Sequence, residues 1–364
     1  MLREVQEIVE LTKSFIRAKA IDASGVTQAM EIAESWLKSR GVRVYKERNQ
    51  GLPMIVAFVG PTGPQDRAKV LLNGHLDVVP GKPEQFEPYE SGGKLFGRGS
   101  YDMLAAAAAM MNCVASLANK SSSQAVALML VPSEETAGEI GTGFLLQKGV
   151  TADFAICGEP TNLGIAIQSK GVLQIELEVS GKAAHGSRPW EGENAIENAL
   201  HLYKQIAELP FMQAHSSCYN GPSLNLARIA AGDAINRVPD KCVIALDIRY
   251  LPGQQWQAIL EEIRGLAPSS IKVISTGAPV CVDQNDPHVL LLAQAVQKYT
   301  GSPARFICQH GAADTRFFAE AGIPSVEFGP VGRNHHGEGE YVEVNSIGTF
   351  LSILKDFIER EVKA

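Results

Sequence analysis

The chain has 364 residues, of which 45% are hydrophobic and 20% charged, with a formal net charge of −7 and a pI near 5.7. This length exceeds what one hydrophobic core usually supports, so we expect two domains. The negative charge argues against nucleic acid or an anionic membrane as the main partner.

The chain begins with a charged, amphipathic segment, Met1–Glu7, that lacks the uninterrupted apolar core of a signal peptide. Residues 2–19 and about 25–40 carry apolar side chains at helical spacing, which predicts two helices. No later stretch has the composition of a membrane span. We therefore expect a cytoplasmic enzyme.

Three strands are predicted next, at Val42–Lys46, Met54–Val59 and Lys69–Leu76. His75 and Asp77 stand at the end of the third strand with one residue between them. On an extended strand this spacing puts both side chains on one face, so the carboxylate can hold the imidazole while its other nitrogen faces a metal. The alternative is a strand end with a solvated histidine and aspartate, and the pair alone does not decide between them.

A Gly- and Pro-rich loop, Pro80–Gly99, is long enough to border a site. Asp102 follows it and opens a segment, Met103–Leu117, that is alanine and methionine nearly all round. A helix apolar on every side is a buried one. Asp102 is then either an N-cap or a ligand at the start of a core helix, and this segment favours neither.

Two more predicted strands are followed by carboxylates. Ala125–Val131 is a continuous apolar run, as in a strand buried on both faces, and Glu134 and Glu135 come just after it. Such acids could also serve only as partners of a helix dipole. Glu159 follows the run Asp153–Cys157 in the same way. Because functional groups gather at the carboxyl ends of strands in a mostly parallel α/β sheet, we expect these acids to meet the histidine and aspartates above.

The pattern changes near Lys170. Val172–Ser180 alternates between apolar and polar residues, as in an antiparallel sheet with one solvated face, and it and its neighbours are available for edge pairing across a dimer. The following segments predict the β-α-β-β-α-β order of a ferredoxin-like unit, with elements at Glu193–Leu209, Ser223–Ala231, Cys242–Tyr250, Gly253–Leu266 and Ile271–Ser275. We therefore expect a domain of residues 170–282 inserted between residues 1–169 and 283–364.

The α/β pattern then resumes, and His335 and His336 lie in a loop, Gly329–Gly339, after a predicted strand at Ser325–Phe328. The other predicted elements of this part are Pro287–Thr300, Ala304–Cys308, a helix near Asp314–Ala321, and Asn345–Val362. Imidazoles and carboxylates without thiolates suit zinc, cobalt or manganese. Their number exceeds the needs of one zinc, so two metals bridged by one carboxylate, with one glutamate left as general base, would use them.

Six cysteines are scattered singly, mostly in apolar surroundings and without a CxxC pair. This usage favours reduced core thiols over disulfides or a thiolate zinc site. They are Cys113, Cys157, Cys218, Cys242, Cys281 and Cys308.

Eight motifs occur in the order GHLDVVP, GRGSYDM, PSEETAG, GEPT, GKAAHGSRP, DIRYLPG, ADTRF and HHGEGEYVEV. In combination they resemble the di-zinc metallopeptidase family of acetylornithine deacetylase / succinyl-diaminopimelate desuccinylase, aminoacylase and glutamate carboxypeptidase. The resemblance covers nearly the whole chain. It implies a mostly parallel-sheet zinc-peptidase catalytic domain with an inserted ferredoxin-like α+β lid domain, through which a homodimer forms.

The resemblance also implies a metal site. His75, Asp102 and Glu159 resemble the ligands of one zinc ion, while Asp102, Glu135 and His336 resemble those of a second. Asp102 would bridge the two ions, which could also be cobalt or manganese. His336 is preferred because the family's histidine usually precedes the glutamate of the Glu-Tyr-Val tail by four positions. Since some members have a different gap, His335 is the alternative.

Other residues resemble catalytic and substrate-binding positions. Asp77 would orient His75, and Glu134 would be the general base. His185 resembles a histidine that reaches the active site of the partner subunit and stabilises the developing oxyanion. Possible contacts to the substrate fall on Asn236, Arg249 and Arg316, and an arginine such as Arg249 could bind a substrate carboxylate with two hydrogen bonds.

The activity implied is hydrolysis of the amide bond of an N-acyl amino acid or small peptide by a metal-activated water. A dipeptidase or carboxypeptidase of the same family is the alternative, and an inactive metal-binding module is a rival of another class. Two departures leave recognition of an acyl group open. Leu104-Ala105-Ala106 follows Met103 where the family often has Lys-Gly-Gly, and Gly-Ala-Ala precedes Asp314 where deacylases often have Gly-Thr-Ser.

Overall fold

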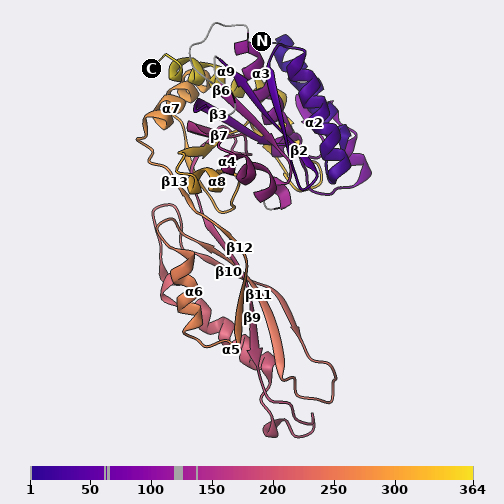
Figure 1. Cartoon of the computed structure of the whole chain (residues 1–364), viewed down its shortest axis with the longest axis vertical. Coiled ribbons are helices and arrows are strands. Elements are labelled where there is room, and N and C mark those ends of the chain that lie inside the picture. The colour runs from indigo at the N-terminus through magenta and orange to yellow at the C-terminus, as the bar shows by residue number, and fades with distance from the viewer. Residues whose placement is uncertain (1, 61–62, 64–65, 119–125, 137, 364) are drawn as a thin grey trace. The chain divides into compact units, whose positions relative to one another are not determined.

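The computed structural model describes residues 2–60, 63, 66–118, 126–136 and 138–363 (Figure 1). The chain forms two compact units. The first comprises Met1–Ile167, Val282–Ile307 and Ala313–Ala364, and the second comprises Gln168–Cys281 and Cys308–Ala312.

A nine-stranded sheet, counted over the described residues, is built mainly from the first unit. Its central strands β6 (Val126–Val131), β3 (Ala68–His75), β7 (Ala152–Cys157) and β15 (Ser325–Glu327) are neighbours in this order and run parallel. The strands that extend this centre on both sides are β1 (Arg43–Asn49), β2 (Leu52–Val59), β8 (Ile165–Ser169), β13 (Val280–Cys281) and β14 (Phe306–Gln309). The α/β class with a mostly parallel central sheet is therefore confirmed. Ala125, the predicted first residue of β6, lies outside the described residues.

Strands β2 and β3 are buried on both faces because helices cover each side of the sheet. On one face, Phe58 and Leu71 pack in a cluster with Leu145 of α4 (Phe144–Gln147) and Phe318 of α8 (Thr315–Glu320). The other face of β3 contacts α3 (Ala105–Ala118) and α9 (Val344–Glu361). The apolar runs of the sequence therefore correspond to central strands.

Helix α3 is buried along most of its length and lies against the ends of two strands. A Cβ atom placed on Gly74 would lie 3.2 Å from the Cβ of Ala107, and one on Gly158 would lie 2.5 Å from Cε of Met103. Glycine at these two positions allows the N-terminal end of α3 to approach β3 and β7 closely. The helix begins at Ala105, two residues later than predicted.

The segment Ser100–Ala118 is long and apolar enough to cross a membrane, but 89% of this stretch is buried inside the protein. Burial of this extent is usual for the core helix of a globular domain. The cytoplasmic location expected from the sequence stays a prediction.

The prediction of an irregular loop at Pro80–Gly99 is wrong in part. A short hairpin, β4 (Tyr89–Ser91) and β5 (Lys94–Phe96), lies within it, joined by two glycines with positive φ. Strand β5 pairs with β17 (Tyr341–Glu343), which in turn pairs with β16 (Gly332–Arg333). Because this pairing joins segments from opposite halves of the chain, the local sequence did not indicate it.

The remaining helices of the first unit are α1 (Leu2–Ala18), α2 (Ala23–Lys38) and α7 (Pro287–Thr300). Near the start of α7, Nδ1 of His288 lies 2.8 Å from Oε1 of Glu361 in α9. The hydrogen bond to this carboxylate raises the pKa of His288. Glu361 is 1% exposed, so this ion pair ties the C-terminal helix to α7 in the interior.

In the second unit the elements follow the order of a ferredoxin-like fold. They are β9 (Gly171–Ser180), α5 (Ala195–Ala207), β10 (Ser223–Ala231), β11 (Lys241–Tyr250), α6 (Trp256–Arg264) and β12 (Ser270–Gly277). The strand order is β10-β11-β9-β12, and every pair is antiparallel. Among the described residues β9 is an inner strand of this sheet, and β10 and β12 lie at its edges. The expected availability for edge pairing is therefore wrong for Val172–Ser180, whereas its neighbours β10 and β12 are edge strands. A role as lid or dimerisation domain stays a prediction.

Cys218 and Cys308 form a disulfide within the second unit, with their Cα atoms 5.9 Å apart. The prediction of reduced thiols is therefore wrong for these two residues. They are 90 positions apart, and only the fold brings them together. Among the described residues the other four cysteines form no disulfide: Cys113, Cys157 and Cys242, which are buried, and Cys281, which is exposed.

Candidate metal-binding site

The candidate metal-binding site lies at the carboxyl ends of three neighbouring parallel strands. His75 is the last residue of β3, Glu135 lies in the turn after β6, and Glu159 comes two residues after β7. Asp102 reaches the same place from the turn η2 (Ser100–Leu104), where its φ and ψ of −117° and 93° are not helical. One ligand atom from each of His75, Asp102 and Glu135 lies within 4.8 Å of the others.

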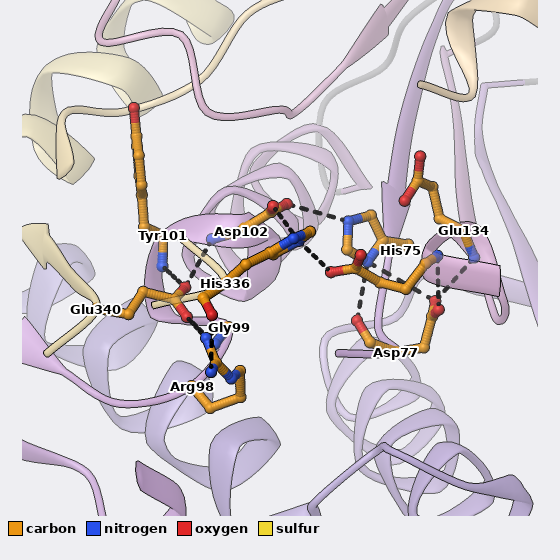
Figure 2. Close-up of polar contacts among 10 residues, drawn as sticks. His75, Asp77, Arg98, Gly99, Tyr101, Asp102, Glu134, His336 and Glu340 are labelled. Carbon is orange, nitrogen blue, oxygen red and sulfur yellow. Dashed lines mark hydrogen bonds and ion pairs between the residues drawn. The ribbon is translucent and has the colours of Figure 1, made fainter. Parts of the chain in front are cut away.

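Asp102 stands between two imidazoles (Figure 2). Its Oδ1 lies 3.3 Å from Nε2 of His75, and its Oδ2 lies 3.2 Å from Nε2 of His336. The same nitrogen of His336 is 3.0 Å from Oε1 of Glu135. His335 instead packs its ring edge-on against Tyr101. The carboxylate of Asp102 thus faces one imidazole with each oxygen, and it does not cap the helix.

Asp77 contacts both sides of the site. Its backbone carbonyl lies 2.9 Å from Nδ1 of His75, while its carboxylate is 3.7 Å from the same nitrogen. The carboxylate oxygens accept hydrogen bonds from the backbone N–H groups of Glu134 and Glu135, at 3.2 and 3.0 Å. Asp77 therefore orients His75 mainly through its carbonyl and holds the turn of the two glutamates through its side chain.

Two buried atoms of the site fit the donor set of a divalent cation. Nε2 of His75 and Oε1 of Glu159 lack a hydrogen-bond partner among the described residues. The contact between His75 and Asp102 is close but is not aligned as a hydrogen bond. Because buried polar atoms are normally paired, a site that leaves an imidazole nitrogen and a carboxylate oxygen unpaired fits a divalent cation.

The electrostatics of the site fit a cation as well. Burial, together with the charges of Asp314, Glu135 and Asp102, raises the pKa of Glu134 to about 8 despite the opposing effect of His75. Burial also raises the pKa of Glu159. Hydrogen bonds to Asp102 and Glu135 raise the pKa of His336 to about 10. Bound protons thus offset the negative charge of the neighbouring carboxylates. A bound metal ion would replace these protons, so we expect metal affinity to rise with pH.

Comparison with known proteins decides the family. The family described as peptidase family M20/M25/M40 matches residues 71–360, which is most of the chain. The chain belongs to peptidase family M20/M25/M40. The predicted family is thereby confirmed, and with it the prediction of a metal-binding hydrolase.

Individual relatives agree with this M20 assignment. The chain is 28% identical over 377 residues to a succinyl-diaminopimelate desuccinylase of Gluconacetobacter diazotrophicus, with 96% of each covered. Its fold is similar to that of aminopeptidase PepT from Bacillus cereus, with a TM-score of 0.82, 18% identity and 99% of both chains covered. A dinuclear metal-binding peptidase of the M20 family from Bacillus subtilis, YXEP, has a TM-score of 0.76 at 14% identity, with 100% of this chain and 99% of that one covered.

A buried polar chain lies beside the predicted ligands. Its member Asp314 belongs to a segment that resembles one beside the family's pocket, whereas the sequence analysis missed Asn73 and Thr142. The side-chain amide of Asn73 donates to Oγ1 of Thr142 at 2.9 Å, and this hydroxyl donates to Oδ2 of Asp314 at 2.6 Å. Burial raises the pKa of Asp314 to about 6, and its charge acts on Glu134. One signal was available, since Asn73 is polar within the apolar run that forms β3.

The remaining predicted site residues of this M20 chain are divided between the two units. Arg316 is buried in the first unit, and its Nη2 lies 3.5 Å from Oε1 of Glu139. His185, Asn236 and Arg249 belong to the second unit. There the backbone N–H of Gly186 donates to the carbonyl of Asn236, and Arg249 directs Nε and Nη2 at the carboxylate of Asp247. Their roles in the site stay predictions.

Proposed function

We propose that this M20 chain is a di-zinc hydrolase that cleaves the amide bond of an N-acyl amino acid or a small peptide. The observation that carries the proposal is the position of Asp102, with one oxygen toward His75 and the other toward His336. A carboxylate between two imidazoles is suited to bridge two cations. The names of the relatives, a desuccinylase and an aminopeptidase, support an amide as the bond attacked.

The ligands divide into two sets that share Asp102. We assign His75, Asp102 and Glu159 to one ion, and Asp102, Glu135 and His336 to the other. Nitrogen and oxygen donors without thiolates suit zinc, and they are also compatible with cobalt or manganese. The neighbour named a dinuclear metal-binding peptidase supports a pair of ions rather than one.

Within this proposal Glu134 acts as general acid and base. The bound cations would supply Lewis-acid activation of water and of the substrate carbonyl. Glu134 accepts a proton from the attacking water and passes it to the leaving amine. Its pKa of about 8 shows how strongly burial and the surrounding acids favour the protonated carboxyl in the metal-free protein. Asp77 fixes the turn that carries Glu134 through the backbone hydrogen bond to that residue.

The proposal is tested on the full chain loaded with zinc or cobalt. We expect about two ions per chain by elemental analysis, and hydrolysis of N-succinyl or N-acetyl amino acids or of dipeptides. Removal of the metal with a chelator should abolish turnover, and adding it back should restore it. One ion per chain would contradict the bridged pair. Two ions without hydrolysis of any of these substrates would instead favour the inactive metal-binding module.

The choice between a deacylase and a dipeptidase or carboxypeptidase depends on the same substrate panel. A deacylase should prefer the acylated amino acids. A dipeptidase should prefer dipeptides with a free amino group, and a carboxypeptidase should release the C-terminal residue of a longer peptide, which is added to the panel. The desuccinylase relative favours the deacylase, because its match to this chain covers 96% of both sequences.

We also propose that the second unit forms a homodimer and brings His185 to the active site of the partner subunit. His185 is exposed, and its Nδ1 lies 2.8 Å from the hydroxyl of Ser187. Nε2 is therefore the ring nitrogen that we propose contacts the substrate. Light scattering should give the mass of a dimer, and His185→Ala should lower kcat by about 10²–10³-fold if the imidazole stabilises an oxyanion. A monomer with full activity would contradict both parts of this proposal.

A further inference from the structure

Glu340 is a buried carboxylate that contacts the turn carrying Asp102 (Figure 2). Its Oε1 accepts hydrogen bonds from the backbone N–H groups of Tyr101 and Asp102, each at 3.1 Å. Its Oε2 accepts another from the N–H of Gly99 at 2.9 Å. Glu340 is 2% exposed, so these bonds form out of contact with water. The backbone of Asp102 is thus held by one carboxylate while its own carboxylate faces the two histidines.

Arg98 links the same carboxylate to the second histidine. Its Nη1 donates to Oε2 of Glu340 at 2.8 Å, and its Nη2 donates to the backbone carbonyl of His336 at 3.3 Å. Arg98 is 3% exposed, and the planar guanidinium lets one side chain hold both partners. The Glu340–Arg98 pair therefore connects the turn of Asp102 with the loop of His336.

The loop of His336 contains two non-glycine residues with a left-handed backbone. His336 has a φ of +58° and Asn334 one of +62°, in the left-handed region that non-glycine residues rarely adopt. Pairing of β17 with β5 places Glu340 beside the segment before Arg98, and the N–H of Gly97 donates to the carbonyl of Glu340. The pairing of β5 with β17 thus brings Glu340 and Arg98 together. Their ion pair then connects the turn of Asp102 with the loop of His336.

We propose that Glu340, together with Arg98, is a positioning element that sets the spacing of Asp102 and His336 before metal binds. The inference rests on the proposed metal site, because positioning matters only if these two residues are ligands. Neither Glu340 nor Arg98 would touch the substrate, and both act through backbone groups of the ligands. Outer groups that orient ligands in this way tune metal affinity by limiting the reorganisation that binding requires.

Glu340→Gln tests the proposal. The amide keeps the size of the side chain but offers one acceptor oxygen. Either the N–H groups of Tyr101 and Asp102 lose their acceptor, or the N–H of Gly99 and Arg98 do. We expect zinc affinity to fall by about 10–100-fold, the range typical of such outer groups. The visible absorption of the cobalt-loaded protein should also change, because the geometry around Asp102 and His336 is altered.

Glu361→Gln is the matched control. Glu361 is a similarly buried carboxylate that forms an ion pair with His288. Within the described part of the chain, no ion pair or side-chain hydrogen bond joins it to a proposed ligand. We expect this variant to lower the melting temperature while zinc affinity and the cobalt spectrum stay as in the wild type. A general loss of stability is thereby separated from loss of ligand positioning.

Arg98→Lys is a second variant that keeps the positive charge. It tests the positioning role even if Glu340→Gln does not fold. One ammonium group cannot hold both Glu340 and the carbonyl of His336 in the geometry of the guanidinium. We expect weaker zinc binding and a changed cobalt spectrum with near-native circular dichroism. Wild-type zinc affinity and spectrum in the folded variants would overturn the positioning role. Fewer than two ions in the wild type would contradict the proposed function itself.

Discussion

Glu134→Gln is expected to lower kcat by about 10²–10⁴-fold, the contribution typical of a general acid–base group, without loss of metal. The amide fills the same space but cannot take a proton from water at neutral pH. Glu134 is assigned to neither ion in the proposed site, so the change leaves every proposed ligand in place. Its backbone N–H would still donate to Asp77, so the turn keeps its place.

The neighbouring residue provides the control for this prediction. Glu135→Gln changes the same functional group one position along the chain, but Oε1 of Glu135 lies 3.0 Å from Nε2 of His336. We expect this variant to lose metal as well as activity. Elemental analysis and kcat on the best substrate separate the two effects. Full turnover in Glu134→Gln would remove Glu134 from the base role, and loss of metal from that variant would make it a ligand.

Asp102→Ala is expected to have the largest effect on metal content, because both ions lose a ligand at once. The loss of affinity should exceed the roughly 10–100-fold typical of residues that only orient ligands. Removing the carboxylate also leaves the imidazoles of His75 and His336 without their common partner. We therefore expect close to no bound zinc per chain at concentrations that load the wild type, and no measurable hydrolysis.

Glu159→Gln is the comparison for that experiment. Glu159 is assigned to one ion only, and its unpaired Oε1 lies in the interior. This variant should keep about one ion per chain, whereas Asp102→Ala should keep neither. If Asp102→Ala binds one ion with the affinity of the wild type, Asp102 does not bridge. The two variants together distinguish a shared ligand from two independent sites.

The α/β class of the chain and most residues of the candidate site could be predicted from local sequence. Three apolar runs indicate parallel strands; one ends in His75, and the other two are followed within a few residues by Glu135 and Glu159. Parallel strands bring their carboxyl ends to one edge of the sheet. The alanine-rich segment after Asp102 indicates a buried helix, and in the structure α3 packs against β3, β6 and α9. These patterns can be recognised locally, because the spacing of apolar residues within one helix or strand indicates which of its faces are buried.

Asp77 shows where this local reasoning stops. Its spacing from His75 predicted that the carboxylate would hold the imidazole. In the structure the backbone carbonyl takes that place, and the carboxylate instead binds the N–H groups of Glu134 and Glu135. A turn that begins more than 50 residues away in sequence thus decided what the side chain does, which spacing within one strand does not reveal.

The sequence by itself determined the α/β class, the family and the residue types that can bind metal, because each follows from short motifs or from the spacing of apolar residues. Only the tertiary structure decided how those residues are held. The Glu340–Arg98 pair, the pairing of β5 with β17 and the Cys218–Cys308 disulfide each join segments far apart in the chain. Their partners become neighbours only when the chain folds, because hydrogen bonds and ion pairs depend on distance in space and not on separation in sequence.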